Sequence, residues 1–320
     1  MKVCVIGNGG REHALAWRLS ISPSVTKVYA IPGSAAMSDC AELVGIDWQQ
    51  SDHLIRFLKD NHVDLVVVGP EAPLVAGLVD ALNVAGIPVF GPSKAAAQLE
   101  GSKVFAKDLM KKYNIPTAAY GVFHKVDEAK EFIAQTGAPI VVKADGLAAG
   151  KGVVVAMTVK EANAAVEDML SGNRFGEAGS TVVIEEFMEG EEASLLAFVD
   201  GKTVVPMVAS QDHKRIFDGD KGPNTGGMGT YAPAPVLTDA LRDEAMKTIL
   251  EPMVAAMQKE DMPYVGCLYA GLMITPQGPK VVEFNARFGD PETQVVLPLL
   301  DSDLGQIMMA CATGTLTADM

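Results

Sequence analysis

A glycine-rich stretch at 140–157, IVVKADGLAAGKGVVVAM, has the residue types of a loop that binds nucleotide phosphates. Glycine leaves backbone N–H groups open to phosphate oxygens, and Lys143 and Lys151 supply positive charge. The β-branched run that follows predicts a strand, so the stretch is predicted to form a hairpin. Two interpretations stay open: a hairpin that closes over phosphates, or an ordinary turn with incidental lysines.

The stretch is not a P-loop, which needs four residues between its first glycine and its Gly-Lys pair. Here only three residues separate Gly146 from Gly150. Gly152 also stands where a P-loop has the Ser or Thr that binds magnesium. A strand rather than a helix follows, so the P-loop interpretation is rejected.

A second group of polar side chains lies in VVEFNARFGDPE, at 281–292. Side chains alternate between two faces along a strand, so Glu283, Asn285 and Arg287 are predicted to share one face. Carboxylate and amide oxygens are suitable ligands for Mg²⁺. The guanidinium beside them can bind a phosphoryl or carboxylate group through two hydrogen bonds. The alternative is a solvated strand face.

The N-terminal segment GNGGREHA, at 7–14, places glycines at the end of a predicted strand. Such glycines can present N–H groups to a phosphate at a helix N-terminus, or they can serve close packing alone. Glu12 takes the place of the third glycine of a dinucleotide fingerprint, and the ribose-binding acid is missing after the second strand. NAD binding is therefore disfavoured, whereas a single phosphate remains plausible. Glu71 follows the third predicted strand at the same edge.

Two further segments carry charged groups. In EEFMEGEEAS, at 185–194, most acids are expected to form a solvated turn, but the backbone edge at 186–188 could bind an adenine and one acid beyond it a ribose. In QDHKR, at 211–215, Lys214 and Arg215 precede a glycine-rich loop at 219–229. This loop is the expected place for a basic site in an acidic protein.

Composition narrows the class of protein. The chain has 320 residues, a net charge of −14 and 48% hydrophobic residues, as in soluble proteins with substantial cores. The acidic balance argues against nucleic acid or an anionic membrane as the main partner. Four widely spaced cysteines and the absence of a signal-like or spanning segment predict a cytoplasmic protein.

The elements that position these groups are predicted from hydrophobic periodicity. Strands at 3–7, 28–32, 65–69 and 89–91, with helices at 12–20, 52–61 and 74–85 between them, predict a doubly wound parallel α/β domain. A helix at 102–113 leads to a strand at 117–123. A compact α+β module follows at about 123–188, and then hairpins at 194–210 and 266–284, with a long helix at 239–259 between them.

Together these pieces resemble the ATP-grasp superfamily and, within it, the glycinamide ribonucleotide synthetase family of phosphoribosylamine–glycine ligases. The resemblance lies in GNGGREHA, GPEAPL at 69–74, KADGLAAGKGV at 143–153, EEFMEGEEAS, QDHKR with NTGGMG, and above all RFGDPETQ at 287–294. It covers the whole chain in the family's order.

The resemblance implies ATP-dependent ligation of glycine to 5-phosphoribosylamine through a glycyl phosphate, giving glycinamide ribonucleotide, ADP and phosphate in purine synthesis. ATP and Mg²⁺, with Mn²⁺ as the alternative ion, are the implied cofactors, and the chain would be a monomer or weak homo-oligomer. The implied domains are an N-terminal substrate-binding domain at 1–102, an ATP-grasp core at 103–122 and 189–320, and a lid at 123–188.

The family's motifs also imply roles for individual residues. ATP would be bound by Lys103, Lys143, Gly146, Gly150, Lys151, Gly152, Glu185, Glu186, Phe187, Met188 and Glu192. Metal would be bound by Glu283 and Asn285. Catalysis would involve Arg287, Asp212, Lys214 and Asp290. Substrate would be bound by Asn8, Gly9, Gly10, Glu71, Thr225, Gly226 and Gly227.

Three departures from the family pattern stand out. Ser34 replaces the Asn of a Pro-Gly-Asn turn, which puts substrate contacts there in doubt. The segment 270–273 lacks the metal-binding acid that many ATP-grasp enzymes carry, so a metal would depend more on phosphates and water. The family's C-terminal domain is expected to be absent, so the chain is expected to be a fragment.

Other functions remain open on the sequence alone. A different ATP-grasp carboxylate–amine ligase would use another acceptor amine. A redox α/β protein would bind NAD(P) at the N-terminal glycines, and a non-catalytic fragment would bind ATP without turnover.

Overall fold

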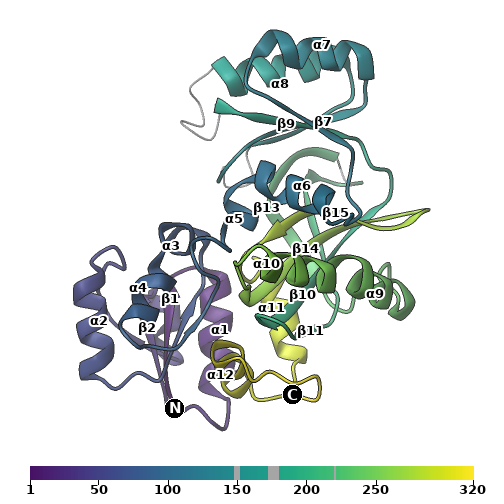
Figure 1. The fold of residues 1–320 in the computed structure, drawn as a ribbon. Coiled ribbons are helices and arrows are strands. Elements are labelled where there is room, and N and C mark those ends of the chain that lie inside the picture. The colour runs from purple at the N-terminus through teal and green to yellow at the C-terminus, as the bar shows by residue number, and fades with distance from the viewer. Residues whose placement is uncertain (148–151, 172–179, 220) are drawn as a thin grey trace.

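The computed structural model describes residues 1–147, 152–171, 180–219 and 221–320. It contains three main sheets and a separate two-stranded ribbon. In Figure 1 the sheet of the lid lies at the top, the N-terminal sheet lies at the lower left, and the core sheet lies between and to the right of them. The predicted arrangement, a parallel α/β domain followed by an α+β core with a small α+β unit above it, is confirmed.

The N-terminal sheet is parallel, with strand order β3-β2-β1-β4-β5. Its strands are β1 (Lys2–Gly7), β2 (Lys27–Pro32), β3 (Glu42–Leu43), β4 (Leu65–Val68) and β5 (Val89–Phe90). Side chains alternate along β1: Val3 and Val5 pack with α1 (Gly10–Ser20), and Cys4 and Ile6 pack with α2 (Ser51–Asp60) and α4 (Leu78–Val84). Helices therefore cover both faces, as the hydrophobic periodicity predicts.

Several predicted elements differ in detail. The single helix predicted at 74–85 is two helices, α3 (Glu71–Ala76) and α4, because Gly77 adopts a left-handed φ of 94° between them. Residues 221–229 of the predicted loop belong instead to β13 (Lys221–Tyr231), which pairs with β12 (Gln211–Phe217). The long helix predicted at 239–259 is α9 (Asp239–Ala245), a π-helical turn at Met246–Leu250, and α10 (Glu251–Lys259).

The core sheet is antiparallel, with order β11-β10-β14-β15. Its strands are β10 (Glu191–Asp200), β11 (Val204–Pro206), β14 (Val265–Thr275) and β15 (Gly278–Asn285). Two short helices, α5 (Gln98–Gly101) and α6 (Lys103–Lys112), join it to the N-terminal sheet. Ser102 caps α6 by accepting a hydrogen bond from the Phe105 N–H. Beyond β15 come α11 (Thr293–Val296), a 3-10 turn at Leu297–Leu299, and α12 (Leu304–Thr313).

The lid sheet has the order β6-β9-β7-β8. Its strands are β6 (Tyr120–Phe123), β7 (Ile140–Ala144), β8 (Val153–Ala156) and β9 (Val182–Glu186), with α7 (Val126–Thr136) and α8 (Val159–Ser171) on the outer face (Figure 1). The buried side chains of this unit form a cluster of their own. The other two clusters each combine side chains of the N-terminal and core sheets.

Within the described residues, no single helix is long and apolar enough to cross a membrane. One pair, Thr293–Leu299 with Leu304–Thr313, meets the length and composition together but is bent by 106°.

Candidate active site

A cleft of about 850 Å³ lies between the lid sheet, α6 and the core sheet. The lid contributes the described glycine-turn residues Gly146 and Leu147, and the core contributes Glu283 and Asn285. One part of the wall is apolar, with side chains from α6, the lid strands and β14: Met110, Val141, Val153, Val155, Phe187 and Met273. The glycine hairpin and the predicted metal-binding strand therefore face one cavity of a size that suits a nucleotide.

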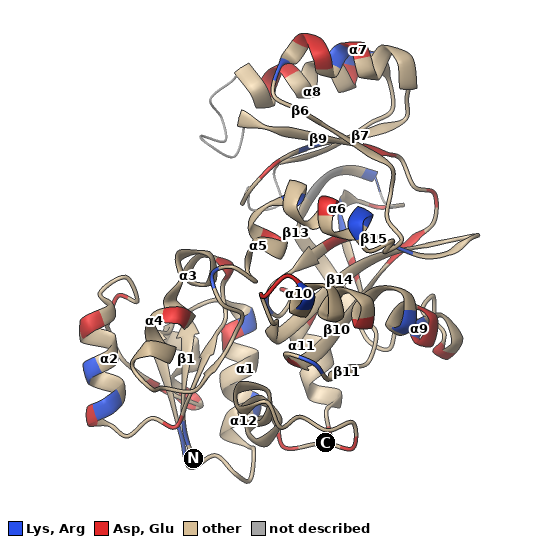
Figure 2. Ribbon diagram, viewed as in Figure 1, with Lys and Arg blue, Asp and Glu red and all other residues tan. Residues whose placement is uncertain are grey.

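Lysines reach this cleft from α6 and β7, and Figure 2 shows basic residues on α6 where it lies beneath the lid. Nζ of Lys143 lies 3.0 Å from Glu185 Oε2, and Nζ of Lys107 lies 3.1 Å from the same oxygen. All three side chains are buried. The other oxygen, Glu185 Oε1, is buried and has no hydrogen-bond partner in the described part of the chain. The carboxylate thus holds two lysines and keeps one acceptor free.

Burial lowers the pKa of Lys107 to about 8, although Glu185 opposes the shift. Burial also lowers the pKa of Lys103, and the negative charge of Glu283 opposes this. Lys103 donates from Nζ to the Gly146 carbonyl at 2.9 Å, which ties the start of α6 to the lid turn. Of the predicted turn residues, Gly150 and Lys151 lie outside the described residues, and Gly152 does not line the cleft. Gly152 instead accepts a hydrogen bond at its carbonyl from the Ala144 N–H.

The end of β9 presents the edge that the sequence predicts for an adenine. Glu186, Phe187 and Met188 line the cleft directly after the buried strand, and Glu192 lines it from β10. Within the described residues, no backbone hydrogen bond occupies the main-chain groups of Phe187 or Met188. The Glu186 N–H, in contrast, donates to the Ala119 carbonyl at 2.9 Å, so among the described residues it is the main chain of Phe187 and Met188 that is open to a ligand at this edge.

On the core side, Glu283 and Asn285 line the cleft from β15. Lys214 Nζ lies 3.9 Å from Glu283 Oε1 and 3.6 Å from Glu192 Oε2. Burial alone would raise the pKa of Glu283, but the positive charges of Lys214, Lys143 and Lys103 outweigh it and lower the pKa. The surrounding anions likewise raise the pKa of Lys214 although burial acts against them. Glu283 is thus held as a carboxylate.

Glu283 and Asn285 suit a hard divalent cation that takes most of its ligands from substrate phosphates and water. No cluster of three or more His, Cys, Asp or Glu side chains that could hold a metal occurs among the described residues. Glu283 and Asn285 offer one carboxylate and one amide oxygen, which suits Mg²⁺ when substrate phosphates and water complete its coordination.

Arg287, just beyond β15, is held on three sides. Its Nη2 donates to Glu100 Oε1 at 2.7 Å, its Nε to Glu71 Oε2 at 3.3 Å, and its Nη1 to the Phe288 carbonyl at 3.2 Å. Burial would lower the pKa of Arg287, but the carboxylates of Glu100 and Glu71 raise it instead. The guanidinium is therefore a fixed positive charge in the wall of the cleft.

The N-terminal glycines stand beside the cleft rather than in its wall. Asn8, Gly9 and Gly10 do not line it, but a Cβ on Gly9 or Gly10 would lie 3.8 Å from a carboxylate oxygen of Asp290, which does. Two other glycines at this edge serve packing. A Cβ on Gly7 would lie 2.4 Å from the Glu12 side chain, and one on Gly69 would lie 2.3 Å from it. The buried Glu12, which accepts from the Gly9 N–H at 2.7 Å, thus fills the space left open in a dinucleotide site.

The predicted substrate loop packs against the catalytic candidates. Thr225 and Gly226 line the cleft, whereas Gly227 does not. Thr225 Oγ1 donates to the Lys214 carbonyl at 2.9 Å and accepts from the Gly227 N–H at 3.1 Å. A Cβ on Gly227 would lie 2.7 Å from Pro291 and 3.0 Å from Asp212, and its φ is 124°, so only glycine suits this position.

Some polar residues of the cleft wall have no role among the sequence predictions, among them Glu100, Lys107, Tyr269 and Glu292. Glu292 Oε1 accepts buried hydrogen bonds from Tyr269 Oη at 2.9 Å and from Ser194 Oγ at 3.1 Å. Lys107 lies one helical turn after Lys103, and this spacing could have indicated that both reach the same face. Nothing in the local sequence marks Glu100 or Tyr269.

Asp212 leads to a prediction about pH. Burial raises its pKa to about 6 from an ordinary 3.8, and Glu292 adds to the rise. Between these values the unfolded chain releases the proton while the folded chain keeps it, so this group lowers stability as pH rises through that window. Asp212→Asn removes the effect and is expected to raise unfolding stability at pH 7.5 by on the order of 1 kcal/mol, after allowance for solvent screening, with no gain near pH 4.

Thermal unfolding of the wild type and of Asp212→Asn, each at pH 7.5 and near pH 4, measures the difference in stability. Equal gains at both values would show that Asp212 is not desolvated in the folded protein.

Comparisons with known proteins agree on one family. Residues 1–100 match the model of the phosphoribosylglycinamide synthetase N domain, and residues 101–293 match that of its ATP-grasp (A) domain. The chain is 57% identical over 314 residues to phosphoribosylamine–glycine ligase of Halalkalibacterium halodurans, covering 98% of this chain and 73% of that protein. It is 56% identical over 316 residues to the same ligase of Agrobacterium fabrum, covering 99% and 74%.

Solved structures include one with the same printed name and one that is similar in fold. The crystal structure of phosphoribosylamine–glycine ligase from Thermotoga maritima superposes with a TM-score of 0.86 at 34% identity, over 99% of this chain and 76% of that chain. The biotin carboxylase domain of Hydrogenobacter thermophilus 2-oxoglutarate carboxylase, solved with MgADP and bicarbonate, has a TM-score of 0.74 at 19% identity, over 98% and 69%. The second likeness concerns the fold alone.

Proposed function

The chain belongs to the phosphoribosylglycinamide synthetase family, and from this premise we propose that it is an ATP-dependent ligase that joins glycine to 5-phosphoribosylamine. Its products are glycinamide ribonucleotide, ADP and phosphate, a step of purine biosynthesis. The observation that carries the proposal is the match of both family domains, in order, over residues 1–293. The cleft between lid and core is the place we assign to the reaction.

ATP and a divalent metal ion are the cofactors of the ATP-grasp family, and we assign Mg²⁺ here. Lys103 and Lys143 bind the phosphates beneath the lid turn, and the apolar wall encloses the base. Main-chain groups of Glu186 and Met188 bind the adenine, and Glu192 binds the ribose. The free main-chain edge after β9 supports this orientation.

Glu283 and Asn285 are the residues that would hold the metal ion. When bound, the ion neutralises phosphate charge and aligns the γ-phosphoryl group for transfer. The low pKa of Glu283 supports this assignment, because the carboxylate is ready to bind a cation at neutral pH.

In the first step a carboxylate oxygen of glycine attacks the γ-phosphorus, and the bond to the bridging oxygen of ADP breaks. Catalysis of such a transfer rests on positioning and on charge neutralisation. Arg287 and Lys214 are the fixed positive charges on the core side of the cleft that we assign to this role. The product is glycyl phosphate with ADP still beneath the lid.

In the second step the amine nitrogen of phosphoribosylamine attacks the acyl carbon, and the bond from that carbon to the phosphate oxygen breaks. The nitrogen must lose a proton. We assign its acceptor to Asp212, whose Oδ1 has no hydrogen-bond partner among the described residues and whose pKa of about 6 leaves it ionised at neutral pH.

The phosphoribosylamine would lie where the N-terminal sheet meets the cleft. Asn8, Gly9, Gly10 and Glu71 come from the carboxyl ends of parallel strands, where ligands of α/β domains bind. Asp290 and the Thr225–Gly227 segment of β13 would close the other side. The closeness of Gly9 and Gly10 to Asp290 supports a pocket shared between the two units.

A coupled ADP-release assay with glycine and freshly prepared phosphoribosylamine tests this function, with each substrate omitted in turn. ADP release is expected only when both are present. ADP release that ignores both substrates would contradict the ligase, and release with glycine and a different amine would indicate another carboxylate–amine ligase of the same fold.

A further inference from the structure

Glu100 binds both the side chain and the backbone at the end of β15. Its Oε1 accepts from Arg287 Nη2 at 2.7 Å, and its Oε2 accepts from the Ala286 N–H at 2.7 Å. The Glu100 side chain is only 7% exposed. One carboxylate therefore fixes the guanidinium and the main chain that carries it at the same time.

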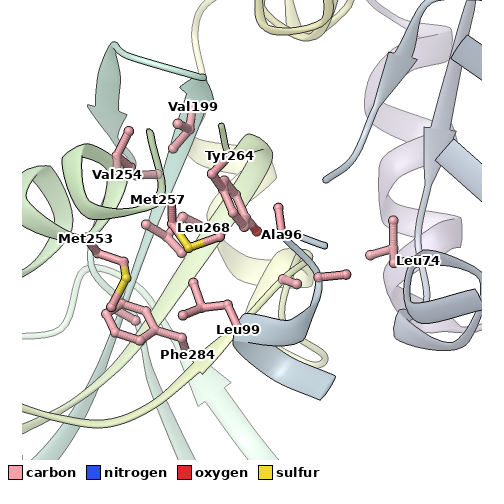
Figure 3. Close-up of a cluster of buried hydrophobic side chains, with 14 of the residues drawn as sticks. Leu74, Ala96, Leu99, Val199, Met253, Val254, Met257, Tyr264, Leu268 and Phe284 are labelled. Atoms are coloured by element: carbon pink, nitrogen blue, oxygen red, sulfur yellow. The ribbon is translucent and has the colours of Figure 1, made fainter. Parts of the chain in front are cut away.

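The helix that carries Glu100 is itself anchored in the core. Leu99, its neighbour on α5, is 1% exposed and packs in the same buried cluster as Phe284 of β15 and Tyr264. Figure 3 shows Leu99 and Phe284 close together in this cluster. Because apolar packing holds α5 against β15, the Glu100 carboxylate has little freedom to follow a displaced arginine.

The hydrogen bonds leave Arg287 with unused donors. Its Nε and one N–H of each terminal nitrogen are bound by Glu71, Glu100 and the Phe288 carbonyl. A guanidinium carries two N–H groups on each terminal nitrogen, so one N–H of each has no partner among the described residues. These N–H groups can donate charge-assisted hydrogen bonds to phosphoryl oxygens.

We propose that Glu100 is a positioning residue for phosphoryl transfer: it sets the orientation in which Arg287 offers its remaining N–H groups to the transferring group. This inference rests on the proposed function of the cleft. Glu100 itself acts only through Arg287 and the Ala286 N–H. A purely structural ion pair would instead affect folding without a specific effect on turnover.

The test is a double-mutant cycle of Glu100→Gln and Arg287→Ala. Glutamine keeps the shape of Glu100, so the fold and the affinity for ATP are expected to change little. Turnover is expected to fall about 10- to 100-fold, because displacement of a positioned group by about 1 Å costs up to about that much. In the Arg287→Ala background, Glu100→Gln is expected to lower turnover by less than about 2-fold, because the group it positions is gone.

The matched control is Glu42→Gln, which breaks an exposed ion pair with Lys27 at the edge of the N-terminal sheet and is expected to leave turnover unchanged. Multiplicative losses in the double variant would overturn the inference. So would a lower unfolding temperature of Glu100→Gln with turnover unchanged.

A second measurement does not depend on the reaction. In protein with ¹⁵N-labelled arginine, the Nη–H signals of Arg287, assigned with an Arg287→Lys variant, are expected to exchange faster with water in Glu100→Gln, because Glu100 accepts from Nη2. Unchanged exchange would overturn the positioning role. Failure of the wild-type chain to release ADP with both substrates would instead overturn the proposed function.

Discussion

Glu283→Gln is expected to lower Mg·ATP-dependent turnover by about 100- to 1,000-fold, a loss of the size seen when one preorganised electrostatic group is removed. The carboxylate and the Asn285 side chain come from the same strand and line the cleft together, which is why we assign both to the metal ion. Its negative charge also balances Lys214, Lys143 and Lys103, which lower its pKa. Glutamine keeps the volume and removes both effects.

The assay is ADP release at several Mg²⁺ concentrations, with unfolding temperature measured in parallel. Glu251→Gln, an exposed substitution on α10, is the matched control and is expected to behave as wild type. Wild-type turnover in Glu283→Gln at every Mg²⁺ concentration would remove Glu283 from the metal site.

Glu185→Leu is expected to cost about 3–5 kcal/mol of unfolding free energy, the range found when one partner of a buried ion pair is removed. Glu185 is the shared anion of Lys107 and Lys143, and all three side chains are buried. Without the carboxylate, two buried ammonium groups lose their counter-charge. Calorimetry should show a fall of roughly 2–4 °C in unfolding temperature for each kcal/mol.

The control for this variant is Glu186→Leu, one residue along the same strand, whose side chain is exposed. The pH dependence adds a further check. The pKa of Lys107 is already lowered to about 8, so a buried lysine can escape its penalty by losing its proton. The difference between Glu185→Leu and wild type is therefore expected to shrink at pH 10, and a difference that grows with pH would contradict the ion-pair explanation.

The sequence predicts the fold well where periodicity is strong. The alternation along β1 and the apolar runs of β2 and β4 specify a parallel sheet, and the glycine hairpin correctly excludes a P-loop. The loop predicted at 219–229 is wrong, because from residue 221 on the chain forms β13. At Gly227 the close approach of Pro291 and Asp212 leaves no room for a side chain, so a glycine is needed within the strand. Low strand propensity is overridden by this tertiary contact.

The site was predictable only where its residues stand in motifs. Glu283, Asn285 and Arg287 could be found because the period of a strand places them on one face. Glu100 could not, because it takes part through Arg287, which is distant in sequence. The spacing of Lys107 from Lys103 indicates a shared helix face, but not the buried ion pair of Lys107 with Glu185. Their burial and pairing arise from tertiary packing that no local pattern records.

The boundary between the two matched family domains falls at residue 100, yet the buried clusters do not divide there. Leu54 and Leu82 belong to the same cluster as Leu250 and Tyr264, and Val3 belongs to one with Met308. Residues 1–100 therefore do not form a separate folding unit. Expressed alone, they would expose to water the side chains that both clusters bury against the core sheet. The described residues of the lid have a buried cluster of their own, so we expect that this unit can be exchanged between relatives by grafting.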